Sequence, residues 1–190
     1  MADEHRGAEP VAARPALASS SPLARWLARW RVPLGFLAAA LVLWLARPTR
    51  LSLLLGAAVS AAGEAIRVWA AGHLEKSREV TTSGPYLWSR HPLYVGSSVI
   101  GIGLAIAAAH LGVAALVAVY LVATISSAIR TEEAFLRARF GGAYDAYTGG
   151  AAPDAGRRFS LARAVRNKEY RAVAGLAVGF ALLALRAWWR

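Results

Sequence analysis

Arg90 and His91 lie side by side in the stretch GPYLWSRHPLYVG, residues 84–96, directly before Pro92 and a long apolar run. Proline is well placed at the first position of a helix, and the N–H groups of a first helical turn can hold an anion. The guanidinium and the imidazole add donors at the same point. The stretch therefore predicts an anion-binding group of residues at the start of an apolar helix.

A second polar stretch, RTEEAFLRARFGGAYDAY at residues 130–147, follows another apolar run. If a helix ends at Glu132 and Glu133, the carboxylates oppose its dipole and need another reason to be there. If the helix continues to about Phe140, that objection weakens and the glycine pair that follows ends it. Tyr144 and Tyr147 then recur at helical spacing. The carboxylate pair is either a solvated helix end or part of a site.

Glu64 and Arg67 stand inside an apolar run, three residues apart, and therefore share a helix face. Ionisable side chains within a membrane span are costly and face a partner or a cavity. The pair either fixes helix packing as an internal ion pair or lines a site.

Several chemistries are excluded by what the chain lacks. It has no cysteine, and its four histidines show no metal-binding spacing, so we predict no metal site. G-x-S-x-G is also missing. The remaining donors, tyrosine rings and carboxylates suit a zwitterionic cofactor with a positive centre, which S-adenosylmethionine matches. NADPH matches the donors but calls for more phosphate-binding groups.

The elements that carry these residues are apolar helices. Hydrophobic residues make up 57% of the chain and charged residues 17%. A spanning helix needs about 20 apolar residues. We predict an all-α polytopic integral membrane bundle of about five transmembrane helices, at residues 32–46, 51–71, 93–109, 111–129 and 172–189. The first and last are short, with Trp or Arg at their ends, and only His110 separates the third from the fourth, which indicates a tight hairpin.

Charge sets the expected orientation. The net charge of +11 is compatible with nucleic acid or with an anionic membrane, and the apolar runs favour the membrane and no nucleic-acid partner. Residues 1–22 mix charges with Pro, Ala and Ser and predict a disordered cytoplasmic tail, followed by a membrane domain at 23–190. Basic residues in the tail, in 72–92 and in 130–171 fall on one side if the amino terminus is cytoplasmic. We expect a bacterial inner-membrane protein with its active site on that side.

Small residues recur every four positions in the third and fifth segments, a spacing that lets membrane helices approach closely. They are Ser97, Gly101, Ala105 and Ala109, and then Gly175 and Gly179. They serve the internal bundle or an oligomer. Two basic amphipathic stretches, residues 21–31 and 159–170, are expected at the membrane interface.

The two polar stretches together resemble the paired signature of the isoprenylcysteine carboxyl methyltransferase family, which extends to phospholipid N-methyltransferases. The resemblance covers roughly residues 67–150 and implies an integral membrane methyltransferase that uses S-adenosylmethionine without a soluble Rossmann domain. Arg67 resembles the arginine that opens the region, and Arg130 corresponds to a substrate-binding arginine. With Arg90 included for its charge, the expected cofactor-binding residues are Val80, Thr81, Tyr86, Arg90, His91, Pro92, Leu93, Tyr94 and Glu132.

The hypothesis for the reaction is in-line transfer of a methyl group to a lipophilic or lipid-linked acceptor that enters from the bilayer. A carboxylate acceptor, held by Arg130, needs no general base, and O-methylation is therefore favoured. An amine acceptor must lose a proton, for which Glu133 or His91 is nearest. The alternatives are an NADPH-dependent membrane reductase of a sterol or polyprenyl double bond, and a non-enzymatic membrane protein.

Overall fold

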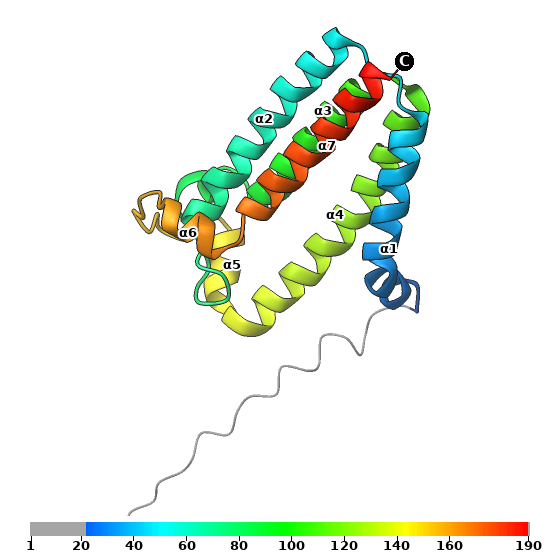
Figure 1. The fold of residues 1–190 in the computed structure, drawn as a ribbon. Helices are drawn as coiled ribbons and strands as arrows, with labels where there is room; N and C mark the ends of the chain where they lie inside the picture. Colours follow the sequence, from blue (N-terminus) through cyan, green and yellow to red (C-terminus); the bar gives the residue numbers. More distant parts are fainter. Residues whose placement is uncertain (1–21, 190) are drawn as a thin grey trace, which may run out of the picture.

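The computed structural model describes residues 22–189, and of residues 22–29, 31, 32 and 34 it describes the backbone alone. In this part of the chain the regular secondary structure is all helical, and there is no strand. Its elements are α1 (Pro22–Leu45), α2 (Arg50–His73), the 3-10 helix η1 (Gly84–Leu87), α3 (Pro92–Ala108), α4 (Leu111–Phe140), α5 (Gly142–Thr148), α6 (Leu161–Arg166) and α7 (Tyr170–Trp188). Long helices run side by side, with α5 and α6 at one end and the end of α7 at the other (Figure 1). The predicted all-α membrane bundle is confirmed, whereas the predicted tail lies outside the described residues except for Pro22.

The predicted segments need correction at two helices. The ends of α2, α3 and α7 fall within two residues of the predicted ones. α1 begins at Pro22 instead of residue 32, because the basic stretch before it continues the same helix through Pro33. α4 runs to Phe140 instead of residue 129, and Gly141 ends it at a φ of 47°. Of the two possibilities left open for Glu132 and Glu133, the structure shows the helix that continues past them.

Three helices, α2, α4 and α7, are long and apolar enough to cross a membrane; α3 and the 35–45 part of α1 are apolar but shorter. The chain is an integral membrane protein. At 1.5 Å per residue, the 30 residues of α4 extend about 45 Å, well beyond a hydrocarbon layer of about 30 Å. The carboxyl-terminal turns of α4, with both glutamates, therefore extend past one face of that layer.

Helices α2 and α3 pack closely against each other at glycines. A Cβ on Gly56 would lie 2.5 Å from the Gly103 carbonyl oxygen, and one on Gly63 would lie 2.7 Å from the Gly96 carbonyl oxygen. The two backbones are therefore too close for any larger residue at these positions. The small residues predicted from their spacing are partly different ones, since a Cβ on Gly101 would meet Leu121 of α4.

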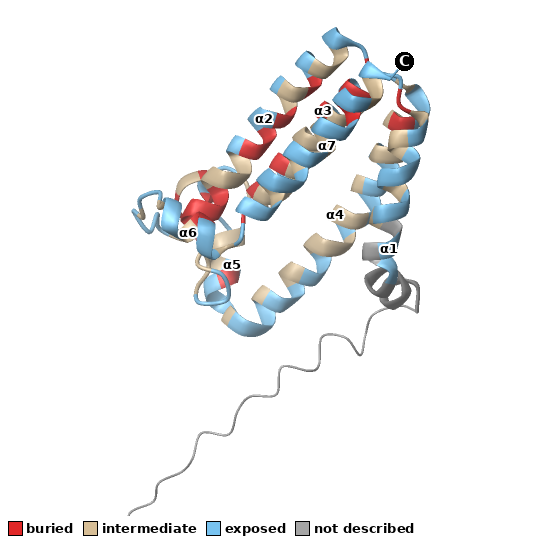
Figure 2. Cartoon of the chain, viewed as in Figure 1, coloured by how far each residue is buried: buried red, intermediate tan, exposed pale blue. Residues whose placement is uncertain are grey.

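At the end opposite α5 and α6, short connections hold the bundle. Ala46, Ala107, Ala108, Val113 and Leu183 form a buried apolar cluster, and burial in general follows the α2–α3 contact (Figure 2). The predicted hairpin at His110 is confirmed, with the preceding residue in the left-handed region at a φ of 47°.

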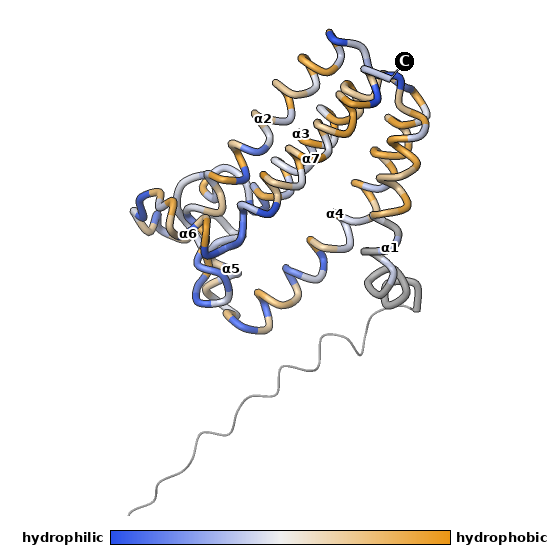
Figure 3. The backbone as a smooth tube through the Cα atoms, viewed as in Figure 1, coloured by the Kyte–Doolittle hydropathy of each residue, from blue (hydrophilic) through white to orange (hydrophobic). Residues whose placement is uncertain are grey.

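Polar residues gather at the other end, while the long helices are mostly apolar along the rest of their length (Figure 3). We call the region formed by residues 74–91 and 130–169 the polar end. It brings together the end of α2, the start of α3, the end of α4 and the segment before α7. Two of the three basic regions in the sequence thus share one end of the bundle.

Candidate active site

The two polar stretches meet at the polar end. His91 precedes α3, and its Nε2 lies 3.1 Å from Oε1 of Glu133 on α4. One turn into α3, the Tyr94 hydroxyl lies near the Glu132 carboxylate. The ring of His91 lies 5.8 Å from that of Tyr94. Each carboxylate of the pair therefore has its own partner on α3.

The start of α3 offers fewer free donors than the sequence suggests. His91 is the N-cap residue, and its carbonyl accepts hydrogen bonds from the N–H groups of Tyr94 and Val95. Those groups are not free to hold an anion. Any anion binding here depends on side chains rather than on the helix end alone.

Tyrosines from α5 and η1 flank the carboxylates. The Tyr147 hydroxyl donates a 2.7 Å hydrogen bond to the carbonyl oxygen of Tyr86, and the ring of Tyr144 lies 6.2 Å from that of Tyr147. Burial raises the pKa of Tyr147 to about 12. Burial, with Glu132 nearby, raises the pKa of Tyr86 as well. These hydroxyls stay protonated at neutral pH.

Tyr144 is the buried member of this group, with 1% of its surface exposed. Its hydroxyl oxygen has no hydrogen-bond partner. Burial raises the pKa of Tyr144, and the charge of Glu133 adds to the effect. The site thus contains a buried, neutral hydroxyl that is available to a ligand.

Three arginines surround the cluster in different ways. Arg137 lies with Nη1 4.0 Å from Glu133 and stacks over the Tyr144 ring at 5.6 Å. Arg90 is exposed and close enough to Tyr144 for its charge to oppose the upward shift of that pKa. Arg130 is exposed and lies on α4 one turn before Glu133. Arg137 was not singled out from the sequence, although its i,i+4 spacing from Glu133 was a usable signal.

The remaining predicted cofactor residues lie in two places. Pro92 is buried at the start of α3, and the Leu93 carbonyl accepts a 3.5 Å hydrogen bond from Arg67. Thr81 is buried in the loop after α2, where its hydroxyl accepts from the Glu75 N–H, with Val80 half-buried beside it in sequence. This contact of Thr81 lies within that loop.

The loop after α2 is fixed by α6 and its neighbours. Arg163 Nε donates to Glu75 Oε1 at 2.8 Å, and this hydrogen bond holds the pKa of Glu75 below its usual value. Asn167 donates to the carbonyls of Ala71 and Leu74. The stretch predicted to rest at the membrane interface thus packs on the end of α2.

A second ionic cluster lies between α2, α3 and the start of α7. Arg67 Nε donates to Glu169 Oε1 at 2.7 Å and lies 3.7 Å from Glu64 Oε2. Arg67 also donates to Ser97 on α3. Glu169 was missed from the sequence because its partner is distant along the chain; its only signal was an acidic residue in a basic segment.

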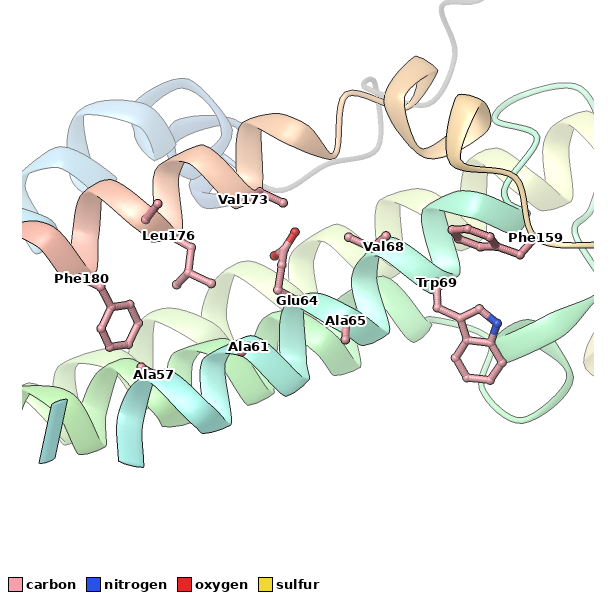
Figure 4. A pocket seen from close by; sticks show the side chains of 11 residues that line it. Ala57, Ala61, Glu64, Ala65, Val68, Trp69, Phe159, Val173, Leu176 and Phe180 are labelled. Carbon is pink, nitrogen blue, oxygen red and sulfur yellow. The ribbon is translucent and has the colours of Figure 1, made fainter. Parts of the chain in front are cut away.

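Glu64 faces a groove of about 830 Å³ between α2 and α7 (Figure 4). The side chain of Glu64 points from α2 toward α7, where Val173 and Leu176 point back. The lining is otherwise apolar. It comprises Ala57, Ala61, Glu64, Ala65, Val68, Trp69, Phe159, Val173, Leu176, Ala177 and Phe180.

Comparison with known proteins places this arrangement in context. The profile of the phospholipid methyltransferase family matches residues 51–143. The chain is 31% identical over 145 residues to the nickel-cobalt-cadmium resistance protein NccN of Alcaligenes xylosoxydans xylosoxydans, covering 68% of this chain and 67% of that protein. It is 34% identical over 121 residues to the cobalt-zinc-cadmium resistance protein CzcN of Cupriavidus metallidurans, covering 58% of this chain and 55% of that protein. No solved structure matches.

Proposed function

Since the chain belongs to the family of NccN and its residues 51–143 match the phospholipid methyltransferases, we propose that it is an S-adenosylmethionine-dependent membrane methyltransferase acting on a lipophilic acceptor. The membership supports a membrane methyltransferase. The cofactor, the acceptor and a closer kinship with isoprenylcysteine carboxyl methyltransferases are parts of the proposal.

The observation that carries the proposal is the meeting of the two polar stretches. Residues 42 positions apart in the sequence, His91 and Glu133, are joined by a 3.1 Å contact. Tyr94 and Glu132 form a parallel contact one turn away. A surface pair of glutamates would have no need of partners on another helix.

The residues present fit S-adenosylmethionine. The Glu132 and Glu133 carboxylates can accept hydrogen bonds from its amine or ribose, and Arg90 can bind its carboxylate. The rings of Tyr94 and Tyr144 suit a sulfonium. The unpartnered Tyr144 hydroxyl, buried among these groups, provides one more polar contact. When bound, this cofactor supplies a methyl group that a nucleophile can displace from sulfur.

The chain contributes alignment and the exclusion of water. Arg130, exposed beside Glu133, is the proposed contact for a carboxylate acceptor, which needs no base. For an amine acceptor, Glu133 is the proposed proton acceptor, and His91 holds that carboxylate in place. Both groups lie at the polar end, which we place on the cytoplasmic side of the bacterial inner membrane.

Calorimetric titration of the detergent-purified protein with S-adenosylhomocysteine, and separately with NADPH, tests the proposal. We expect S-adenosylhomocysteine to bind and NADPH not to bind. Glu132→Ala and His91→Ala should each lower the affinity for S-adenosylhomocysteine at least about tenfold, the loss expected for a hydrogen bond to a charged group. Glu79→Ala, a glutamate of the loop paired with Arg157, is the matched control. Unchanged affinity in both site variants would contradict the site, and binding of NADPH alone would make the protein a reductase.

The names of the relatives support a role in metal tolerance. Within residues 22–189 no cluster of three or more His, Asp or Glu side chains could hold a metal ion, and the chain has no cysteine. We therefore propose that any contribution to resistance comes from methylation rather than from metal binding. Expression of the wild type, but not of Glu132→Ala, should improve growth of a sensitive bacterium on nickel, cobalt or cadmium. Equal protection by both would overturn this role.

A further inference from the structure

We propose that the groove between α2 and α7 is the acceptor site and that Glu64 recognises the amino group of a single-chain lipophilic amine. The inference rests on the proposed function in one respect, namely that the molecule bound in the groove accepts a methyl group. It assigns an amine where O-methylation of a carboxylate was favoured from the sequence. It also names a specificity-determining residue outside the cluster formed by His91, Tyr94, Glu132 and Glu133.

Glu64 is a buried carboxylate with unused hydrogen-bonding capacity. Only 8% of the residue is exposed, and neither carboxylate oxygen has a hydrogen-bond partner. A buried charge is costly unless it is paired and hydrogen-bonded. The side chain points across the groove toward α7 (Figure 4), so a donor bound there would meet it directly.

The nearest cation does not satisfy Glu64. Arg67 Nε lies 3.7 Å from the Glu64 carboxylate, beyond hydrogen-bonding distance, and donates instead to Glu169 at 2.7 Å. The Nη1 of Arg67 donates to Ser97 and to the Leu93 carbonyl. One guanidinium thus faces two carboxylates. The cluster favours one more cation or hydrogen-bond donor on the groove side.

The groove selects against anionic head groups. Its lining contains no Lys, Arg or His side chain, so nothing in it complements a phosphate or a carboxylate. The aromatic rings of Trp69 and Phe159 line it near the polar end, and aromatic faces favour cations. A volume of about 830 Å³ lies within the range of small-molecule sites. These properties point to one apolar chain ending in an amine, without a phosphate.

Arg67 connects the groove to the proposed cofactor site. Its contacts with Leu93 and Ser97 lie on the first turns of α3, on either side of Tyr94 in the sequence. Its charge also acts on the Tyr94 hydroxyl, which lies near Glu132. Arg67 therefore links the Glu64 carboxylate, 3.7 Å from its Nε, to the turns of α3 that carry Tyr94.

Equilibrium binding of radiolabelled dodecylamine and dodecanoic acid to the full chain in phosphatidylcholine nanodiscs, with empty nanodiscs subtracted, tests the inference. The wild type should prefer dodecylamine. Glu64→Gln, which keeps the size and removes the charge, should weaken dodecylamine about tenfold or more and leave dodecanoic acid unchanged. Leu176→Phe, which fills the groove, should weaken both probes. Val178 lies on α7 and is 60% exposed. Val178→Phe is the matched control for Leu176→Phe and should leave the binding of both probes unchanged.

S-adenosylhomocysteine titrated into the same nanodiscs reports whether each variant is folded and separates the two proposals. If S-adenosylhomocysteine binds but dodecylamine binding does not depend on Glu64, only the groove assignment is overturned. Glu64-dependent binding of dodecylamine without S-adenosylhomocysteine binding would overturn the proposed function and support the groove. Preference for dodecanoic acid, or displacement of dodecylamine by phosphatidylethanolamine in the nanodisc, would overturn the single-chain amine.

Discussion

At the scale of single residues, the proposed cofactor site depends on hydroxyl groups that remain neutral. The Tyr147 hydroxyl donates to the Tyr86 carbonyl, and burial raises its pKa from 10.0 to about 12. Below pH 10 this tyrosine is protonated in both the folded and the unfolded chain. Between pH 10 and about 12 the unfolded chain loses its proton first, so the free energy of unfolding falls in this window.

Tyr147→Phe should therefore lower stability near neutral pH by about 1 kcal/mol, the typical contribution of one hydrogen bond. It should also reduce the fall in stability above pH 10, because one group with a raised pKa is removed. Thermal unfolding of wild type and variant in detergent from pH 7 to 11 measures both effects. Parallel pH curves for the two proteins would contradict the assignment of the shift to Tyr147.

The sequence indicated that the two polar stretches belong together, in agreement with the contact between His91 and Glu133, but it did not indicate how their residues pair. His91 and the glutamate pair were expected together, but spacing alone does not determine which carboxylate meets which partner on α3. Periodicity along α4 cannot determine this pairing, because it depends on how α4 is rotated against α3. Glu169 escaped notice for the same reason, since its contact with Arg67 spans 102 residues.

At the scale of helices, the ion pair of Arg67 and Glu169 connects α2 to the start of α7. Removing one partner of a buried ion pair costs about 3–5 kcal/mol, whereas replacing both with apolar residues costs much less. Arg67→Met and Glu169→Leu should each destabilise the protein strongly, and the double variant should be more stable than the sum of the two effects predicts. Denaturant unfolding of the four proteins gives the coupling energy, and additive effects would show that the pair does not join these helices.

The contact between α2 and α3 makes a separate prediction. Gly63→Ala places a Cβ 2.7 Å from one backbone atom and 2.8 Å from another, so the two helices must move apart. We expect a loss of about 1–3 kcal/mol, as for other overpacked sites. Gly175→Ala, on α7, meets no atom within 4 Å and should be neutral or slightly stabilising. Equal melting temperatures for the two variants would contradict the close contact.

The helices themselves were largely predictable because apolar runs with basic or glycine ends define them. The differences at α1 and α4 arise where a helix extends beyond the apolar run, since hydropathy falls at a charged stretch although the helix continues through it. Packing was less predictable: Gly175 and Gly179 have the spacing of a contact, yet no atom lies near a Cβ built on either.

At the scale of the whole molecule, orientation can be tested directly because the chain has no cysteine. Lys76→Cys lies at the polar end and Leu111→Cys, 85% exposed, at the opposite end. In a bacterial host, a membrane-impermeant maleimide should label the first only in inverted membrane vesicles and the second only in intact spheroplasts. The reverse result would place the proposed site outside the cytoplasm.

The position of α7 after the other long helices has a consequence for biogenesis. Glu169 and five of the groove-lining residues belong to the last fifth of the sequence, so they leave the ribosome after α2, α3 and α4 are already made. Until then, Arg67 and Glu64 have only each other and the start of α3. A nascent or truncated chain would therefore present the cofactor motif without an acceptor groove. We expect binding in the groove to require that α7 has been made and inserted.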